Sequence, residues 1–136
     1  MRECVLLFQF EQTKQKKLVA QLMLSKFKVK VVGLEEMEQP IGYLAGNKEL
    51  FQEEAAPQQA HPLDGEMLVM AGITPNRLNM VLQAIRKAGI GPVPYKAVVT
   101  QTNQTWKAKD LLEELKKEHE AMQEQNNDGK MLHEQT

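Results

Sequence analysis

The sequence predicts an α+β fold: a four-stranded sheet made of two β-α-β halves, ferredoxin-like in arrangement, plus one helix at the C-terminus. The chain of 136 residues has the length of a single domain. Two short runs, residues 4–10 and 67–71, are apolar on both faces, as interior strands of a sheet are. Each run is followed by a helical pattern and a further short strand, so the chain repeats one pattern twice.

The first half of this pattern ends in a strand of alternating character. After the apolar run, residues 11–25 carry Leu18 and Leu22 on one helical face, with lysines and glutamines elsewhere. Residues 27–32 then alternate between apolar residues and the lysines Lys28 and Lys30. Because such alternation is typical of a half-exposed strand, we expect this strand at an edge of the sheet.

The helix of the second half has clear start and stop signals. Thr74 offers an N-cap hydroxyl, and Pro75 follows at the first helical position, where its missing N–H would have no partner in any case. Gly89 is suited to end the helix, because glycine adopts the left-handed conformation without strain. Residues 95–100 are then expected to form the fourth strand.

The remaining segments are less regular. Residues 34–65 form an irregular insert, in which we expect a short helix at residues 40–46 and a mobile surface loop at residues 53–64. The last helix is expected to begin near Thr105. Residues 123–136 are rich in polar side chains and are predicted to be a disordered tail.

Two topologies satisfy this pattern over a single domain of residues 1–122. One is a ferredoxin-like antiparallel sheet with helices on one face, which we favour. The alternative is a parallel, doubly wound α/β sheet, in which residues 40–46 form a reduced crossover helix. Both place the first and third strands in the centre of the sheet. Since these strands are apolar on both faces, the last helix or the insert must cover the second face.

Composition restricts the classes of partner and compartment. Seventeen Lys and Arg against eighteen Asp and Glu give a net charge of −1, which argues against general binding to nucleic acid or to a membrane surface. The single cysteine, Cys4, forms no internal disulfide, as is usual in a reducing compartment. With no signal peptide and no apolar run of membrane-spanning length, we expect a cytoplasmic protein.

A turn rich in hydroxyl and amide side chains follows the fourth strand and is the candidate functional site. Such groups beside the N-terminus of a helix suit an anion or carboxylate, and a tryptophan there offers a stacking surface. The structural alternative is that the same residues only stabilise the turn and cap the helix. The candidate ligand-binding residues are Lys96, Thr100, Thr102, Asn103, Thr105 and Trp106.

Lys96 has two interpretations. It is a charged residue inside an otherwise apolar strand, so its ammonium is either directed at a ligand or placed on the exposed side of an edge strand. The second role is common, because lysines deter aggregation at sheet edges.

Patterns of the common catalytic and metal sites are missing from the sequence. His61, His119 and His133 share no metal-site spacing with each other or with Cys4. There is no glycine-rich phosphate loop and no nucleophile elbow, and Ser25 is the only serine. We therefore predict no catalytic residue, no metal and no cofactor.

One stretch carries a recognisable motif: Lys96-Ala97-Val98-Val99-Thr100-x-Thr102-Asn103-x-x-Trp106. With the run Leu-Leu-Glu-Glu-Leu-Lys-Lys-Glu-His-Glu at residues 111–120, it resembles a family of small bacterial proteins that are classed only as a domain of unknown function. The resemblance extends to residues 67–89 and, more weakly, to residues 39–44. In that family a Ser or Thr after the tryptophan caps the helix. Here Lys107 stands in its place, so Asn103 or Thr105 is expected to be the cap.

The resemblance implies no activity, and three hypotheses follow from the residues. The first is a non-catalytic cytosolic domain that binds a small anionic ligand or a partner protein at residues 100–106. The second is a small enzyme on the same turn, which would use Lys96, Thr100, Thr102 and Asn103. The third is a purely structural turn that holds the last helix against the sheet. A homodimer formed through an edge strand is left open by all three.

Overall fold

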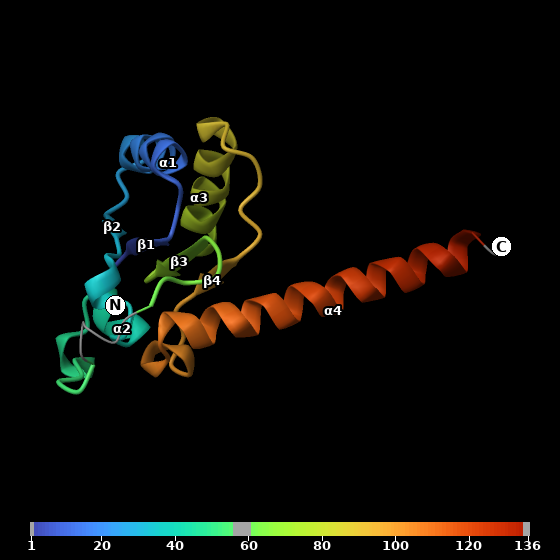
Figure 1. Ribbon diagram of the computed structural model, residues 1–136. Helices are drawn as coiled ribbons and strands as arrows, with labels where there is room; N and C mark the ends of the chain where they lie inside the picture. Colours follow the sequence, from blue (N-terminus) through green and yellow to red (C-terminus); the bar gives the residue numbers. More distant parts are fainter. Residues whose placement is uncertain (1, 56–60, 135–136) are drawn as a thin grey trace.

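The computed structural model describes residues 2–55 and 61–134, with side chains up to residue 123. Figure 1 shows a sheet between helices and one long helix that leaves the domain. The strands are β1 (Cys4–Phe8), β2 (Val29–Val31), β3 (Met67–Ala71) and β4 (Lys96–Val98). The helices are α1 (Gln12–Leu24), α2 (Ile41–Leu44), α3 (Pro75–Ala88) and α4 (Ala108–Glu134), with 3-10 turns η1 (Leu34–Glu36), η2 (Lys48–Leu50) and η4 (Asn103–Thr105).

The four strands form one sheet in the order β2-β1-β3-β4. Each β-α-β half makes a parallel pair of neighbours, β1 with β2 and β3 with β4. The two halves meet through an antiparallel pair, in which Val5 lies opposite Met70 and Leu7 opposite Leu68. The predicted two halves are therefore present, and the first and third strands are central as expected.

The ferredoxin-like antiparallel arrangement is wrong. That topology leaves one strand position between the two strands of each half, whereas here each helix returns the chain directly beside the strand that it left. Val5 N–H, for example, donates to Lys28 C=O at 2.8 Å. The parallel doubly wound alternative is wrong as well, because β1 and β3 are antiparallel and the short helix α2 connects no neighbouring parallel strands.

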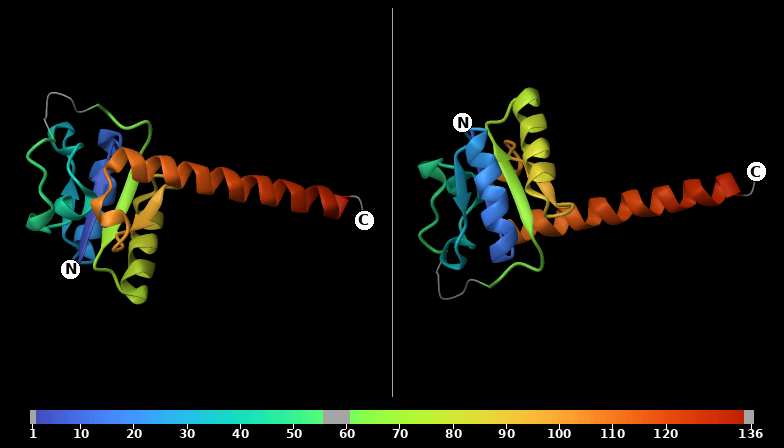
Figure 2. Two further views of the ribbon diagram at one scale, coloured as in Figure 1. Left: turned by 90° about the horizontal axis from the view of Figure 1, so that it is seen from below. Right: turned by 90° about the horizontal axis from the view of Figure 1, so that it is seen from above.

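Helices cover both faces of the sheet, as the two-sided apolarity of β1 and β3 requires. Figures 1 and 2 show α1 and α3 on one face, with α2 and the start of α4 on the other. Val5 and Leu7 pack under α1 and α3, and the alternate residues Leu6 and Phe8 pack under α2 and α4. The second face is thus covered jointly by the insert, through α2, and by the last helix.

The expected signals bound helix α3. Thr74 Oγ1 accepts a hydrogen bond from Arg77 N–H at 3.3 Å, and Pro75 is the first helical residue. Gly89 ends the helix with φ = 66°. The short helix expected at residues 40–46 is also present, as α2, and part of the expected loop, residues 56–60, lies outside the described residues.

Helix α4 packs on the domain only over its first turns. Ala108, Leu111 and Leu112 are buried against the sheet, and beyond Met122 the helix stands clear of the domain (Figure 2). The segment expected to be a disordered tail is helical in the structure up to Glu134. The polar composition of this segment provides few apolar residues that could pack on a core, which is why disorder was expected. Gln, Glu and Lys nevertheless have a high intrinsic preference for the helix. In the described part of the chain, no helix combines the length and apolarity needed to cross a membrane.

Candidate functional site

Asn103 covers part of the open edge of β4. Tyr95 C=O and Val99 N–H bond to β3 at 3.0 and 2.8 Å, so the alternate residues Val98 and Thr100 direct their backbone groups away from the sheet. The side chain of Asn103 meets these groups: its Nδ2 donates to Val98 C=O at 3.0 Å, and its Oδ1 accepts from Thr100 N–H at 2.8 Å. The amide thus stands where a neighbouring strand would lie, and Asn103 is only 9% exposed.

The same turn fixes α2 over the sheet. Trp106 C=O accepts a hydrogen bond from Ile41 N–H at 2.8 Å, and Pro40 forms an isolated β-bridge with Lys107. Gly42 lies so close that a Cβ there would be 2.9 Å from Gln104 C=O. The turn between β4 and α4 therefore also forms part of the surface on which α2 packs.

Neither Asn103 nor Thr105 caps helix α4, contrary to the expectation from the sequence. Trp106 is extended (φ = −79°, ψ = 152°), so the helix begins at Ala108, and Lys107 C=O accepts from Leu111 N–H at 3.2 Å. Thr105 Oγ1 instead contacts Thr102 C=O at 3.5 Å. The N-cap position thus belongs to Lys107, which has no side-chain acceptor.

Five of the six candidate residues line one shallow groove of about 280 Å³ between β4 and α4. They are Lys96, Thr100, Thr102, Asn103 and Trp106. Helix α4 supplies the opposite wall through Leu111, Glu114, Leu115 and Glu118. The structure therefore brings most of the candidate residues together. Asn103 has a structural role in the turn, and the carboxylates of α4 line the groove although they were not predicted to do so.

The ammonium of Lys96 is directed away from the turn. Its Nζ donates to Val93 C=O, and Val93 is buried in the cluster beneath α1 and α3. Burial lowers the pKa of the Lys96 ammonium from its ordinary value. Since β4 is an edge strand, Lys96 fits the role of an edge lysine better than that of a ligand-facing cation.

Trp106 is half-buried and is shared by two depressions. The indole packs against the core cluster under α2 and α4. Trp106 also lines a second depression of about 350 Å³, together with Asp110, Glu113, Glu114 and Lys117. An aromatic side chain that stays partly exposed between two hollows is a suitable contact for a ligand.

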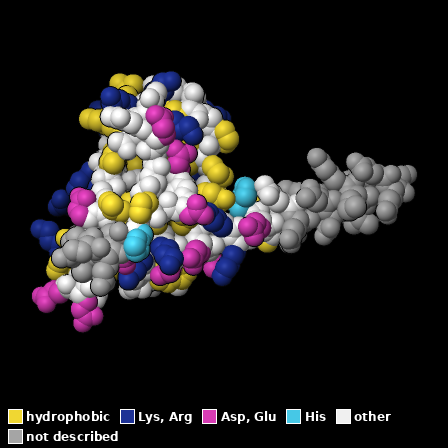
Figure 3. Space-filling model, viewed as in Figure 1, with side chains coloured by type: hydrophobic (Ala, Val, Ile, Leu, Met, Phe, Trp, Pro, Cys, Tyr) yellow, Lys and Arg dark blue, Asp and Glu magenta, His cyan; other side chains and the backbone are white. Residues whose placement is uncertain are grey.

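A row of carboxylates runs along α4 beside this indole. Asp110, Glu114 and Glu118 are spaced by four residues and so lie on one helical face. Like charges at this spacing destabilise a helix by about 0.2–0.5 kcal/mol per pair. No ion pair within residues 2–55 and 61–123 engages any of the three. In Figure 3 acidic side chains stand among lysines along the first part of α4. The spacing was present in the sequence and could have revealed this row.

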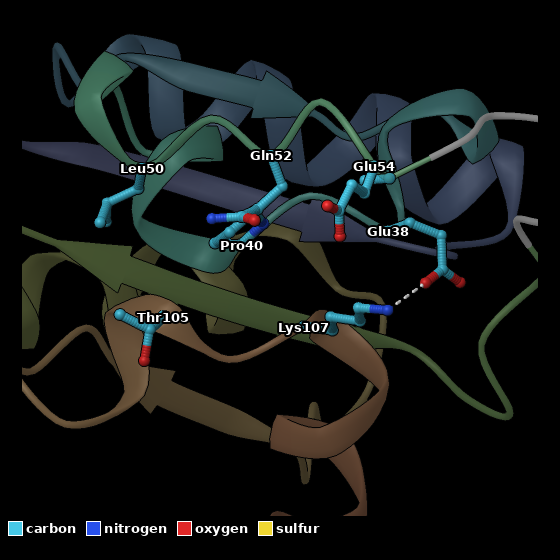
Figure 4. A pocket seen from close by; sticks show the side chains of 8 residues that line it. Glu38, Pro40, Leu50, Gln52, Glu54, Thr105 and Lys107 are labelled. Carbon is cyan, nitrogen blue, oxygen red and sulfur yellow. Dashed lines mark ion pairs between the residues drawn. The ribbon is translucent and has the colours of Figure 1, made fainter.

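Thr105, the sixth candidate residue, lies on the other side of the turn. Figure 4 shows it with Lys107 at the rim of a pocket of about 380 Å³, whose opposite wall is formed by Pro40, Leu50 and Gln52. Lys107 Nζ lies 2.9 Å from Glu38 Oε2, a contact that raises the pKa of Lys107. Thr105 therefore does not belong to the groove at Trp106.

A buried amide holds the wall of this pocket. Gln39 is 7% exposed, and its Nε2 donates to Gln52 C=O at 2.9 Å, while its Oε1 accepts from Gln52 N–H at 3.0 Å. One side chain thus satisfies both backbone groups of a residue in the insert. This role could not be predicted, because a single glutamine in an irregular segment has no local pattern.

Residues 66–122 match the family model of a domain of unknown function (DUF3783). The match runs from β3 to the first part of α4 and so contains all six candidate residues. It agrees with the expected resemblance to an uncharacterised domain family. No curated protein and no solved structure matches the chain.

Proposed function

We propose that this protein is a non-catalytic binding domain that docks a basic segment of a partner protein in the groove around Trp106. The observation that carries the proposal is a half-buried indole flanked by the α4 carboxylates. A cytoplasmic location and a bacterial origin, as the motif and the cysteine content suggest, form part of the same proposal.

The charges of the groove favour a cation over an anion. The two depressions at Trp106 are lined by Asp110, Glu113, Glu114 and Glu118, against only Lys96 and Lys117. One of these two ammonium groups is already bonded to the carbonyl of Val93. A lysine or arginine of a partner gains from this negative field and from contact with the indole face. A small anionic ligand would be repelled at the same place.

The open edge of β4 offers backbone partners for such a segment. Asn103 occupies Val98 C=O and Thr100 N–H, while alternation leaves the Lys96 backbone groups and Val98 N–H on the outer edge. An extended peptide can add to a sheet through such groups, with side chains that reach the neighbouring hollows. The docked segment would therefore be short, with its basic side chain directed at α4.

An enzyme on this turn is less well supported. The candidate chemistry needs an ionisable group directed at the turn, and Lys96 was the residue proposed for it. Because the Lys96 ammonium is bonded to Val93 C=O, the turn itself presents hydroxyls and an amide whose oxygen and nitrogen each bond a backbone group. These groups suit recognition rather than proton transfer.

The emission of Trp106 provides the test, because it is the only tryptophan in the chain. The probe is a blocked peptide with alternating arginine and valine, compared with its counterpart in which glutamate replaces arginine. We expect a saturable change with the arginine peptide alone. The double variant Glu114→Gln/Glu118→Gln should weaken binding several-fold. Glu120→Gln, on the same helix but outside the groove lining, should not.

Equal responses to both peptides, or equal affinity of all variants, would remove the proposed function. Light scattering of the same samples separates a further outcome. If the free protein is a homodimer that the peptide dissociates, the edge of β4 is already occupied by a second copy, and the natural partner is the chain itself.

A further inference from the structure

A basic concavity lies near β2, which is the edge strand opposite to β4 and to the turn that contains Trp106. Its main hollow, of about 760 Å³, is bounded by the start of β1, by Lys28 before β2 and by the link from α2 to η2. An adjoining hollow of about 450 Å³ shares Cys4, Lys28 and Lys48 with it. Figure 3 shows dark-blue side chains at the margin of the molecule beside β2 and α2.

Three cations line this concavity without a counter-ion. Arg2, Lys28 and Lys48 are exposed, and no ion pair within residues 2–55 and 61–123 engages them. Glu3 is the one acidic residue among the lining of the main hollow. Its carboxylate is held by Arg77, whose Nε and Nη2 lie 2.9 and 2.8 Å from the two oxygens. The hollow is therefore positive in a protein whose net charge is −1.

The uncharged residues of the same lining provide further hydrogen-bond donors and leave open space in the hollow. Asn47 Oδ1 accepts from Glu49 N–H at 3.2 Å, which leaves the Nδ2 hydrogens of Asn47 as donors. Apart from Gly46 and its two chain neighbours, no residue has an atom within 4 Å of where a Cβ of Gly46 would be, so the space beside Lys48 is open. Cys4 forms the apolar floor and is 4% exposed.

We propose that this concavity binds a phosphorylated small molecule of nucleotide size. Its volume is in the range of small-molecule sites, about 300–1,000 Å³. Phosphate oxygens accept from ammonium, guanidinium and amide donors, which are the three kinds present. The site shares no lining residue with the groove at Trp106, so it adds a second ligand class to the protein.

A small molecule fits this lining better than a nucleic acid does. Nucleic-acid surfaces spread cations along a face or stripe and usually belong to strongly basic domains. Here the cations converge on one hollow in an acidic chain with a calculated isoelectric point of about 6.3. Binding of an oligonucleotide is therefore an outcome that counts against the proposal.

Calorimetry with inorganic pyrophosphate and with ADP tests the site, and adenosine serves as the uncharged probe. We expect one saturable site for pyrophosphate and ADP and none for adenosine. Lys28→Gln and Lys48→Gln should each weaken ADP binding about tenfold, since each removes a charge-assisted hydrogen bond. Lys17→Gln, an exposed lysine on α1 outside the concavity, should bind ADP as the wild type does.

Cys4, the only cysteine, gives a second readout. ADP should slow its modification by a thiol reagent in the wild type and not in the Lys28→Gln/Lys48→Gln double variant. ADP should also leave the emission of Trp106 unchanged, which separates this site from the groove. The proposal is overturned if neither phosphate probe binds saturably or if the double variant binds ADP like the wild type. Tighter binding of a single-stranded oligonucleotide than of ADP would also overturn it.

Discussion

Asn103 and Thr100 hold each other through two hydrogen bonds that run in opposite directions. Thr100 N–H donates to Asn103 Oδ1 at 2.8 Å, and Asn103 N–H donates to Thr100 Oγ1 at 3.1 Å. A third bond joins Asn103 Nδ2 to Val98 C=O. One buried amide thus closes the turn, covers the end of the β4 edge and also lines the groove at Trp106.

Replacing Asn103 by alanine should destabilise the protein by about 1–3 kcal/mol. The change removes the side-chain hydrogen bonds to Val98 C=O and Thr100 N–H, and each such bond contributes about 0.5–1.5 kcal/mol to stability. Denaturant unfolding measures the free energy. Gln101→Ala, an exposed neighbour in the same turn, is the control and should change it by less than about 0.5 kcal/mol. Equal effects of both variants would contradict the edge-covering role.

Gly42→Ala should also destabilise the protein, by about 1–3 kcal/mol, because the added methyl does not fit between α2 and the residues on which it packs. Its Cβ would lie 2.5 Å from Leu50 Cδ1 and 2.9 Å from Gln104 C=O. Gly33→Ala is the matched control, since the nearest atoms to a methyl there belong to the exposed carboxylate end of Glu35. It should leave stability unchanged or raise it by up to about 1 kcal/mol. Thermal unfolding of the two variants would show the contrast, and its absence would mean that α2 is not tightly seated.

The Glu3–Arg77 pair predicts a pH dependence of stability. The hydrogen bond from Arg77 holds the pKa of Glu3 below its ordinary value of 4.5. A carboxyl with a lowered folded-state pKa stabilises the protein above the unfolded-state pKa, and this contribution is lost as the pH falls through the folded-state pKa. Glu3→Gln should therefore be less stable than the wild type at neutral pH, and the difference should shrink below pH 4.5. A difference that stays constant on acidification would contradict this, and Glu120→Gln serves as the exposed control.

Removal of residues 123–136 should leave the domain intact. The contacts of α4 with the sheet come from its first turns, through Ala108, Leu111 and Leu112. The truncated protein should match the full chain in free energy of unfolding to within about 0.5 kcal/mol and lose only helical circular dichroism. A larger loss of stability would show that the far part of α4 supports the domain. The single domain of residues 1–122 stays a prediction until then.

The elements of this fold could be predicted from local signals, whereas their order in the sheet could not. Thr74, Pro75 and Gly89 bound α3 through chemistry that acts over a few residues. The apolar residues on both faces of β1 and β3 likewise predicted that these two strands lie in the centre of the sheet. Whether a helix returns beside its own strand or one position further is decided by packing between the halves, so the ferredoxin-like prediction was wrong.

The sequence predicts the residues of the candidate site, and the structure shows which of them lie together and what they contact. The polar turn does line a groove, yet Asn103 serves the backbone and Lys96 is directed at Val93. Lys96 lies on an edge strand, as one of its two interpretations expected, whereas the bonds of Asn103 to the outer backbone groups of β4 depend on the folded path of the turn. The four-residue spacing of acids on α4 was visible in the sequence, but its meaning required the position of Trp106 beside the helix.

Titration of the protein with the arginine–valine peptide, followed by ¹H–¹⁵N spectra, tests the central claim most directly. The indole N–H of Trp106 gives a unique signal, because the chain has one tryptophan. The account predicts saturable shifts of this signal and of the backbone signals of Lys96, Val98 and residues 110–118, with none at Arg2. Shifts confined to other surfaces, or a Trp106 signal that does not move at saturation, would contradict it.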